Sequence, residues 1–185
     1  MFLDYALRNV LKDKDNLKIL DLCAAPGGKS TLISSFLGNK GLLVSNEVIR
    51  TRANILAENI IKWNAANAVV TNNDPSHFKT LEGFFDAIVC DVPCSGSGMF
   101  RKDKAAMHEW SLNAVELCAA RQKRILADVL PSLKTGGYLF YSTCSYSVQE
   151  NEEVLDWLIE NFEMESVDLN PSVEWGIVKT YSNQH

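Results

Sequence analysis

The 185-residue sequence has no long apolar run, and this absence argues against a membrane protein. A transmembrane helix needs about 20 consecutive apolar residues, and no segment approaches that length. The start of the chain, Met1 to Tyr5, also lacks the basic and apolar regions of a signal peptide. We therefore expect a cytoplasmic protein that has no membrane partner.

The chain is also poor in the residue patterns that build metal centres and disulfide frameworks. Its five cysteines are an odd number without dense spacing, no Cys-x-x-Cys pair occurs, and its three histidines lie far apart. Structural zinc sites and disulfide-stapled folds need closer spacing than this. We expect reduced thiols and no metal.

Two common nucleotide-binding loops are missing as well. Neither GxGxxG nor GxxxxGK[ST] is present, and the first apolar run is followed by only two adjacent glycines, Gly27 and Gly28. A nicotinamide cofactor and ATP hydrolysis are therefore not favoured.

The net charge of −5 argues by itself against a nucleic-acid partner, but the charges are unevenly distributed. Residues 1–149 hold 17 Lys and Arg against 14 Asp and Glu, whereas residues 150–185 hold one Lys against nine acids. The main body is thus mildly basic, and the acids are most simply explained as the solvated face of a late helix. Net charge does not exclude RNA.

Short apolar runs alternate with longer segments of helical period, which predicts an α/β fold with a mostly parallel sheet and helices on both faces. Five strands are expected, at Leu17 to Leu22, Leu42 to Ser45, Ala68 to Thr71, Phe85 to Cys90 and Tyr138 to Ser142, and Met164 to Leu169 could be a sixth. Helical faces are expected at Leu32 to Leu37, Ala53 to Ile61, Val115 to Leu133 and Val148 to Phe162. The length favours a single domain.

The loop from Asp21 to Ser30 connects the first predicted strand to a helix. In open α/β sheets, ligands bind beyond the carboxyl ends of the strands, and the first such loop is the usual nucleotide site. Its small residues let a ligand approach the backbone, and the next helix offers free amide donors: Ala24, Ala25, Gly27 and Gly28. A tight turn without a ligand is the alternative.

Two acids follow the next strands. Glu47 lies about 20 residues after the glycines, where an acid commonly binds a ribose diol. Asp74, after the third strand, could read an adenine amino group. Helix capping by an exposed Glu47 and an Asx-turn at Asp74 explain the two residues equally well when each is taken alone.

Two cysteines lie on loops that follow the fourth and fifth predicted strands. Cys94 sits among Pro and Gly residues after Asp91, and Cys144 follows Ser142-Thr143. Adjacent strands would bring the two thiols together, whereas Cys90 and Cys118 lie in apolar patterns and are expected in the core. Attack by a thiolate on carbon 6 of a pyrimidine makes carbon 5 nucleophilic enough to accept a methyl group. Chemistry alone does not decide which thiol attacks.

These motifs together closely resemble the Nop/Sun (RsmB-like) family of RNA cytosine-5 methyltransferases, over roughly Met1 to Leu169. The segment Met99 to Asp103 looks most like the ribosomal-RNA branch similar to RsmF. The family has a Rossmann-like class I methyltransferase fold. The resemblance implies that Cys144 is the nucleophile, that Cys94 assists product release, and that Asp91 contacts the cofactor. It assigns S-adenosylmethionine to Cys23, Ala24, Ala25, Pro26, Gly27, Gly28, Lys29, Glu47, Asp74 and Asp91. By its chemistry alone, Asp91 could also hydrogen-bond the base and stabilise charge as the adduct forms.

The sequence departs from the family pattern at both ends. The family usually has an RNA-binding region before this domain and a further strand in the sheet. We therefore interpret residues 1–185 as one catalytic domain, with residues 1–16 as the remnant of a preceding helix, residues 170–185 as a truncated tail, and a C-terminal strand missing. The unpaired sheet edge could then mediate association.

RNA, with ribosomal RNA favoured over transfer RNA, is the expected partner. Two basic clusters could steer its phosphates, although solvated surface explains them about as well: Arg101, Lys102, Lys104 and Arg121, Lys123, Arg124. The alternative function is a non-catalytic RNA-binding or ribosome-assembly module that has kept the fold.

Overall fold

The computed structural model describes residues 2–180, and the chain forms two compact units. The sheet unit comprises Met1–Val92 and Ile125–Ser142, and the cysteine unit comprises Pro93–Arg124 and Thr143–His185. Among the described residues, no helix has both the length and the apolar character needed to cross a membrane.

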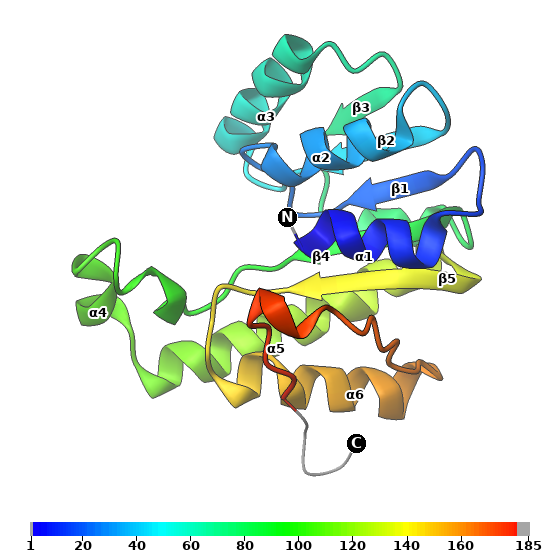
Figure 1. Cartoon of the computed structure of the whole chain (residues 1–185). Helices are drawn as coiled ribbons and strands as arrows, with labels where there is room; N and C mark the ends of the chain where they lie inside the picture. The colour runs from blue at the N-terminus through cyan, green and yellow to red at the C-terminus, as the bar shows by residue number, and fades with distance from the viewer. Residues whose placement is uncertain (1, 181–185) are drawn as a thin grey trace. The chain divides into compact units, whose positions relative to one another are not determined.

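The sheet unit is a five-stranded parallel sheet with the strand order β3-β2-β1-β4-β5 (Figure 1). Its strands are β1 (Lys18–Asp21), β2 (Leu42–Asn46), β3 (Ala68–Thr71), β4 (Phe85–Asp91) and β5 (Leu133–Ser142). Its helices are α1 (Phe2–Leu11), α2 (Gly28–Leu37), α3 (Arg50–Trp63) and the 3-10 helices η1 (Pro75–Thr80) and η3 (Leu130–Ser132). All five predicted strands are confirmed, and all five pair in parallel as expected.

Both faces of this sheet are buried. Ile19 of β1 packs with Leu43 and Ala87 against residues of α1 and α2. The next residue, Leu20, points to the opposite face and is fully buried, as is its neighbour Ile88 on β4. Side chains alternate between the faces of a strand, so the sheet is covered on both sides, as the apolar strands of a parallel sheet require.

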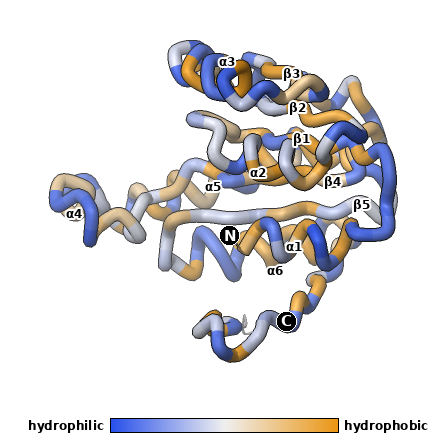
Figure 2. Tube along the Cα trace, turned by 45° about the horizontal axis from the view of Figure 1, so that its top comes forward, coloured by the Kyte–Doolittle hydropathy of each residue, from blue (hydrophilic) through white to orange (hydrophobic). Residues whose placement is uncertain are grey.

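Helix α3 covers part of the sheet with one face only. Ala53, Leu56 and Ile60 recur at helical spacing and are buried, whereas Ile61 is 76% exposed. Figure 2 shows the resulting mixture of hydrophilic and hydrophobic residues along α3. The predicted helical face from Ala53 to Ile61 is therefore correct except at its last position.

The cysteine unit contains short helices and loops. Its elements are η2 (Ser97–Met99), α4 (Ala105–Glu109), η4 (Val148–Glu150), α6 (Glu152–Phe162) and η5 (Val173–Trp175). Helix α5 (Leu112–Val129) continues from this unit into the sheet unit.

Two predictions about the last third of the chain were wrong. The helix predicted to continue to Leu133 ends at Val129, because Pro131 lies in η3 and cannot continue an α-helix; Leu133 instead begins β5. Residues 164–169 form no strand. There the carboxylate of Asp168 accepts the backbone N–H of Asn170 at 2.9 Å, which closes a local turn in place of strand pairing.

Strands β3 and β5 form the two edges of the sheet, and no further strand occurs among the residues described after Ser142. Residue Val69 on β3 is 49% exposed. Association through an unpaired edge stays a prediction.

Candidate active site

The loop between β1 and α2 is held in place by helix α3. The side chain of Arg52 donates to the carbonyl of Ala25 at 2.9 Å, and that of Asn59 donates to the carbonyl of Pro26 at 2.8 Å. All seven predicted cofactor residues in 23–29 lie in this loop or in the first turn of α2. These hydrogen bonds from α3 hold the loop in one conformation. A site that binds a ligand through backbone groups requires such a fixed conformation.

The two glycines of this loop have different roles. Gly27 has a φ of +117°, and a Cβ atom there would lie 3.2 Å from Cδ1 of Leu56, so the position needs glycine for both conformation and packing. Gly28 is the first residue of α2, and a Cβ atom there would meet nothing within 4 Å. The space beside Gly28 is open, next to the free amide groups of a helix N-terminus.

Asn46, at the carboxyl end of β2, was missed by the sequence analysis. Its carbonyl accepts the N–H of Ala24 at 2.8 Å, and its side-chain amide donates to the carbonyls of Leu22 and Asn73. Its side-chain oxygen accepts the hydroxyl of Thr71 at 2.8 Å. One buried amide thus joins the loops after three strands. The only sequence signal was an Asn directly after a predicted strand.

Asp21, the last residue of β1, is a fully buried carboxyl group. Its Oδ2 accepts the hydroxyl of Ser30 at 2.6 Å, whereas its Oδ1 is buried without a hydrogen-bond partner among the described residues. Burial raises its pKa to about 6, a hydrogen bond from Ser30 and the charge of Lys29 lower it, and the charges of Asp91 and Glu47 raise it. The pKa of Asp21 therefore depends on the charges of Lys29, Asp91 and Glu47.

We expect Asp21 to make the protein less stable as the pH rises from about 4 to about 6. The folded-state pKa lies above the unfolded value of 3.8, so the folded state binds more protons in this window and loses stability as they leave. The loss should be about 3 kcal/mol, at about 1.4 kcal/mol per pKa unit. Urea unfolding of wild type and Asp21→Asn at several pH values checks this. Parallel stability profiles for the two proteins would contradict it.

The two predicted acids after β2 and β3 lie in different surroundings. Glu47 is 3% exposed, so it is not the exposed capping residue of the alternative interpretation; it accepts the N–H of Ile49 and pairs with Arg52 at 3.4 Å. Asp74 accepts the N–H and the hydroxyl of Ser76 and thereby caps η1, as the turn interpretation predicts. A cofactor contact by either acid stays a prediction.

Asp91, the last residue of β4, joins three segments of the sheet unit. Its Oδ2 lies 2.6 Å from Nζ of Lys29, and its Oδ1 accepts the hydroxyl of Ser142 at 2.7 Å. Ser142 pairs with Asp91 in register as the last residue of β5. Both carboxylate oxygens are therefore engaged by this unit's own residues.

Cys23 lies among these acids as an unreactive thiol. Burial, together with the negative charges of Asp21 and Glu47, raises its pKa to about 12. A cysteine that stays protonated is a poor nucleophile. Its place in the loop between β1 and α2 therefore does not point to thiolate chemistry.

The cysteine unit brings Cys94 and Cys144 together. Their Sγ atoms lie 2.9 Å apart, both thiols are free, and the N–H of Cys144 donates to Sγ of Cys94 at 3.3 Å. The sequence analysis predicted that loops after adjacent strands would meet, and the parallel pairing of β4 with β5 confirms that premise.

The two thiols are not equivalent. Cys144 is exposed, whereas Cys94 is partly buried. Burial raises the pKa of Cys94 to about 12, the hydrogen bond with the Cys144 thiol also raises it, and backbone N–H groups of Cys144 and Gly96 lower it. At neutral pH Cys94 is therefore a protonated thiol beside the accessible Cys144. The asymmetry favours Cys144 as the attacking group.

Gly98 is where the two cysteine loops touch. Its N–H donates to the carbonyl of Cys144 at 2.7 Å, and a Cβ atom at this position would lie only 2.5 Å from that oxygen. The hydroxyl of Ser97 accepts the N–H of Tyr146 at 2.9 Å. Only glycine permits this close approach, which sets the position of Cys144 relative to the Cys94 loop.

Glu150 is a buried residue that hydrogen-bonds to both the loop of Cys94 and the loop of Cys144. Its fully buried carboxylate accepts the N–H of Ser95 at 2.8 Å, the hydroxyl of Ser145 at 2.6 Å and the side-chain amide of Gln122 at 3.1 Å. Ser95 and Ser145 each follow one of the two cysteines directly. No local pattern marks Glu150 as an anchor, because the burial of an acid is not visible in a sequence.

The remaining predicted residues fall into two groups. Cys90 is buried in β4 as expected, but Cys118 is only partly buried and its prediction as a core residue was too strong. The basic residues are exposed except for Lys123, which lies over the ring of Trp157 at 5.9 Å. Their role toward RNA stays a prediction.

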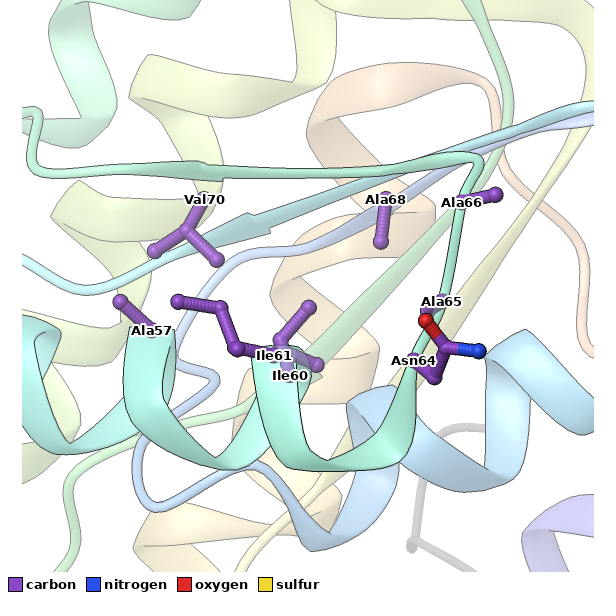
Figure 3. A pocket seen from close by; sticks show the side chains of 8 residues that line it. All are labelled: Ala57, Ile60, Ile61, Asn64, Ala65, Ala66, Ala68 and Val70. Atoms are coloured by element: carbon purple, nitrogen blue, oxygen red, sulfur yellow. The ribbon is translucent and has the colours of Figure 1, made fainter.

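A separate apolar pocket of about 420 Å³ lies between α3 and β3 (Figure 3). It is lined by Ala57, Ile60, Ile61, Asn64, Ala65, Ala66, Ala68 and Val70. The lining offers one amide and no titratable group, so this pocket is not the candidate active site. No cluster of three or more potential metal ligands occurs among residues 2–180.

Comparisons with known proteins found a family match and several relatives. The profile of the family described as 16S rRNA methyltransferase RsmB/F matches residues 8–183. Ribosomal RNA small subunit methyltransferase F of Pectobacterium atrosepticum is 42% identical over 155 residues, which are 81% of this chain and 32% of that protein. The tRNA (cytosine(49)-C(5))-methyltransferase of Pyrococcus abyssi is 39% identical over 173 residues, 90% of this chain and 56% of that protein. The chain thus spans about a third and about half of these two relatives.

A solved structure is also similar. The crystal structure of NSun6 from Pyrococcus horikoshii with SFG, an analogue of S-adenosylmethionine, superposes with a TM-score of 0.72 at 31% identity. The match covers 85% of this chain and 40% of that protein.

Proposed function

The chain belongs to the RsmB/F family of 16S rRNA methyltransferases, and from this premise we propose that it methylates carbon 5 of cytosine in RNA by way of a covalent bond to Cys144. The predicted family and the Rossmann-like class I methyltransferase fold are both confirmed. The observation that carries the proposed mechanism is the pair of free thiols, Cys94 and Cys144, at 2.9 Å. The non-catalytic alternative is not favoured, because the relatives are named as methyltransferases.

The carboxyl end of the sheet unit fits S-adenosylmethionine, the family's cofactor. The unpartnered Oδ1 of Asp21 and the neighbouring acids Glu47 and Asp91 suit a ligand with a sulfonium and an ammonium charge. The open space at Gly28 beside a helix N-terminus suits the ligand's carboxylate. We assign Glu47 to the ribose hydroxyls and Asp74 to the adenine. Bound S-adenosylmethionine supplies an electrophilic methyl group.

The first step forms a bond between Cys144 and the base. The thiol of Cys144 loses its proton to solvent, and a sulfur electron pair forms a bond to carbon 6 of cytosine. The electron pair of the carbon 5–carbon 6 double bond moves to carbon 5, which becomes the nucleophile for the methyl group. Asp91 accepts a hydrogen bond from the cytosine amino group and holds the base for attack. The target base must be unstacked, because carbon 6 is hidden in a helix.

The last step removes the carbon 5 proton and releases the enzyme. The electron pair of that C–H bond re-forms the double bond, and the bond from carbon 6 to Cys144 breaks to return a thiolate. While Cys144 is bonded to carbon 6, its sulfur is a thioether, so the thiol–thiol hydrogen bond that is one cause of the raised pKa of Cys94 is weakened. With its pKa lowered, Cys94 loses its thiol proton to solvent more readily, and the resulting thiolate accepts the carbon 5 proton, which gives Cys94 its role in release.

Ribosomal RNA is the substrate that we propose, since the Pectobacterium relative is named for it, although the Pyrococcus relative is named for tRNA. Transfer of tritiated methyl groups to ribosomal RNA and to tRNA, each extracted from cells that lack the gene, tests the proposal. Label in 5-methylcytosine from ribosomal RNA is expected. Label in tRNA alone would change the substrate, and no label in either would contradict the proposed activity.

Gly27 and Gly28 provide a matched pair for the cofactor site. Gly28→Ala adds a methyl group into the open space where the cofactor carboxylate is proposed, so we expect S-adenosylmethionine to bind about tenfold more weakly without loss of stability. Gly27→Ala is strained at a φ of +117° and should lower the free energy of unfolding by about 1 to 2 kcal/mol. Calorimetric titration and thermal unfolding check both. Unchanged cofactor affinity in Gly28→Ala would argue against this placement.

A further inference from the structure

An aromatic pocket of about 490 Å³ lies within the cysteine unit, and the proposed chemistry does not use it. It is lined by Ser97, Gly98, Phe100, Arg101, Trp110, Tyr146 and Ser147. The rings of Phe100 and Trp110 meet edge to face, with centroids 6.3 Å apart and planes at 90°. This volume lies in the usual range for small-ligand sites.

Two side chains in the lining have groups that water alone does not satisfy well: an exposed aromatic ring and a buried N–H donor. Tyr146 is 77% exposed, which leaves a large ring uncovered. The indole Nε1–H of Trp110 is buried and has no hydrogen-bond acceptor among the residues the structure describes. Buried Trp N–H groups usually have a partner, so an acceptor on a ligand beside Trp110 would satisfy an otherwise unpaired donor.

The pocket is built directly onto the loop that carries Cys144. Gly98 donates to the carbonyl of Cys144, and Ser97 accepts from the N–H of Tyr146, two residues further along. A ligand in this pocket would therefore lie beside the proposed nucleophile. In the proposed reaction, such a ligand would be a neighbour of the reacting base.

The aromatic and cationic side chains of the lining suit the bases of single-stranded RNA. Bases of single-stranded RNA stack on aromatic rings and on guanidinium groups, and they present carbonyl and ring-nitrogen acceptors. Arg101 supplies a cation at the pocket, and Lys102 and Lys104 follow it as exposed residues that can attract phosphates. A peptide partner would not call for this local positive charge.

We propose that this pocket binds the base of a nucleotide that flanks the target cytosine, with Tyr146 as the stacking surface and Trp110 Nε1 as a hydrogen-bond donor. The inference rests on the proposed function and deepens it. If the pocket binds this base, the protein contacts at least two nucleotides of an unpaired RNA segment. The substrate then needs a suitable base beside the target cytosine as well as the cytosine itself.

The test uses a short single-stranded RNA in which 2-aminopurine flanks a cytosine, because stacking quenches the fluorescence of 2-aminopurine. We expect the 185-residue chain to quench it, Tyr146→Ala to weaken binding roughly tenfold, and Trp110→Phe to weaken it a few-fold because the ring stays but the N–H is lost. Trp63→Ala, at an exposed ring on α3, is the matched control and should bind as wild type. Thermal unfolding checks that the exposed Tyr146 can be replaced without loss of fold.

Unchanged quenching in Tyr146→Ala, an equal loss in Trp63→Ala, or no quenching by wild type would each overturn the inference. Its failure is distinguishable from failure of the proposed function, which is read by a covalent adduct on RNA that contains 5-azacytosine. An adduct in wild type without quenching rejects the pocket and keeps the methyltransferase. Quenching without an adduct keeps the pocket and rejects the methyltransferase. For an active enzyme, Tyr146→Ala should raise KM for RNA and leave KM for S-adenosylmethionine unchanged.

Discussion

Replacing Cys144 with Ala is expected to abolish methylation, with a loss on the order of 10⁴-fold or more, as for removal of the nucleophile in other covalent enzymes. The covalent adduct with RNA that contains 5-azacytosine should disappear with it. The other four thiols are poor substitutes, because the pKa is raised to about 12 at Cys94 and Cys23 and is also raised at Cys90 and Cys118. Denaturing gel electrophoresis of protein mixed with labelled RNA measures the adduct.

Cys94→Ala is the matched variant, because it removes the other half of the same sulfur pair. It should still form the adduct and should accumulate it on unmodified RNA, since release is slowed. Cys118→Ala, at a partly buried thiol on α5, should behave as wild type. An adduct that persists in Cys144→Ala and is lost in Cys94→Ala would reverse the two assignments.

Glu150→Ala is expected to have the largest effect of any change away from the sulfur atoms. Hydrogen bonds to a charged group contribute about 1.5 to 3 kcal/mol each, and this variant leaves the donors on Ser95, Gln122 and Ser145 without their common acceptor. We expect the free energy of unfolding to fall by about 3 kcal/mol or more. We also expect methylation to fall roughly 100-fold, because the two cysteine loops lose their shared anchor.

Two further variants separate a positioning role from a purely structural one. Glu150→Gln keeps the shape and one oxygen acceptor, so it should recover most of the stability but only part of the adduct-formation rate. Glu153→Ala, an exposed acid on α6, should change neither. Urea unfolding and the rate of adduct formation measure the two effects. A Glu150→Gln protein with wild-type adduct kinetics would show that the carboxylate acts on stability alone.

Much of the fold could be predicted because hydrophobic periodicity is a local signal. The runs around Leu20, Val44 and Ile88 predicted buried parallel strands, and the structure buries all three on one face of the sheet. The prediction failed where local sequence competes with pairing. Residues 164–169 have a strand-like pattern but close a turn through Asp168, and a pattern does not reveal whether a partner strand is present.

The sequence by itself determined which residue types are available for chemistry and at which strand ends they occur. Glycine at the first loop and cysteine after both Asp91 and Ser142 are local properties, and a parallel sheet necessarily places the ends of its strands along one edge. The tertiary structure alone decided how those residues differ. Burial raises the pKa of Cys94 beside an exposed Cys144, leaves Asp21 with an unpartnered oxygen and turns Glu150 into a shared anchor. Desolvation and hydrogen bonding depend on residues distant in sequence, so no local pattern could have revealed them.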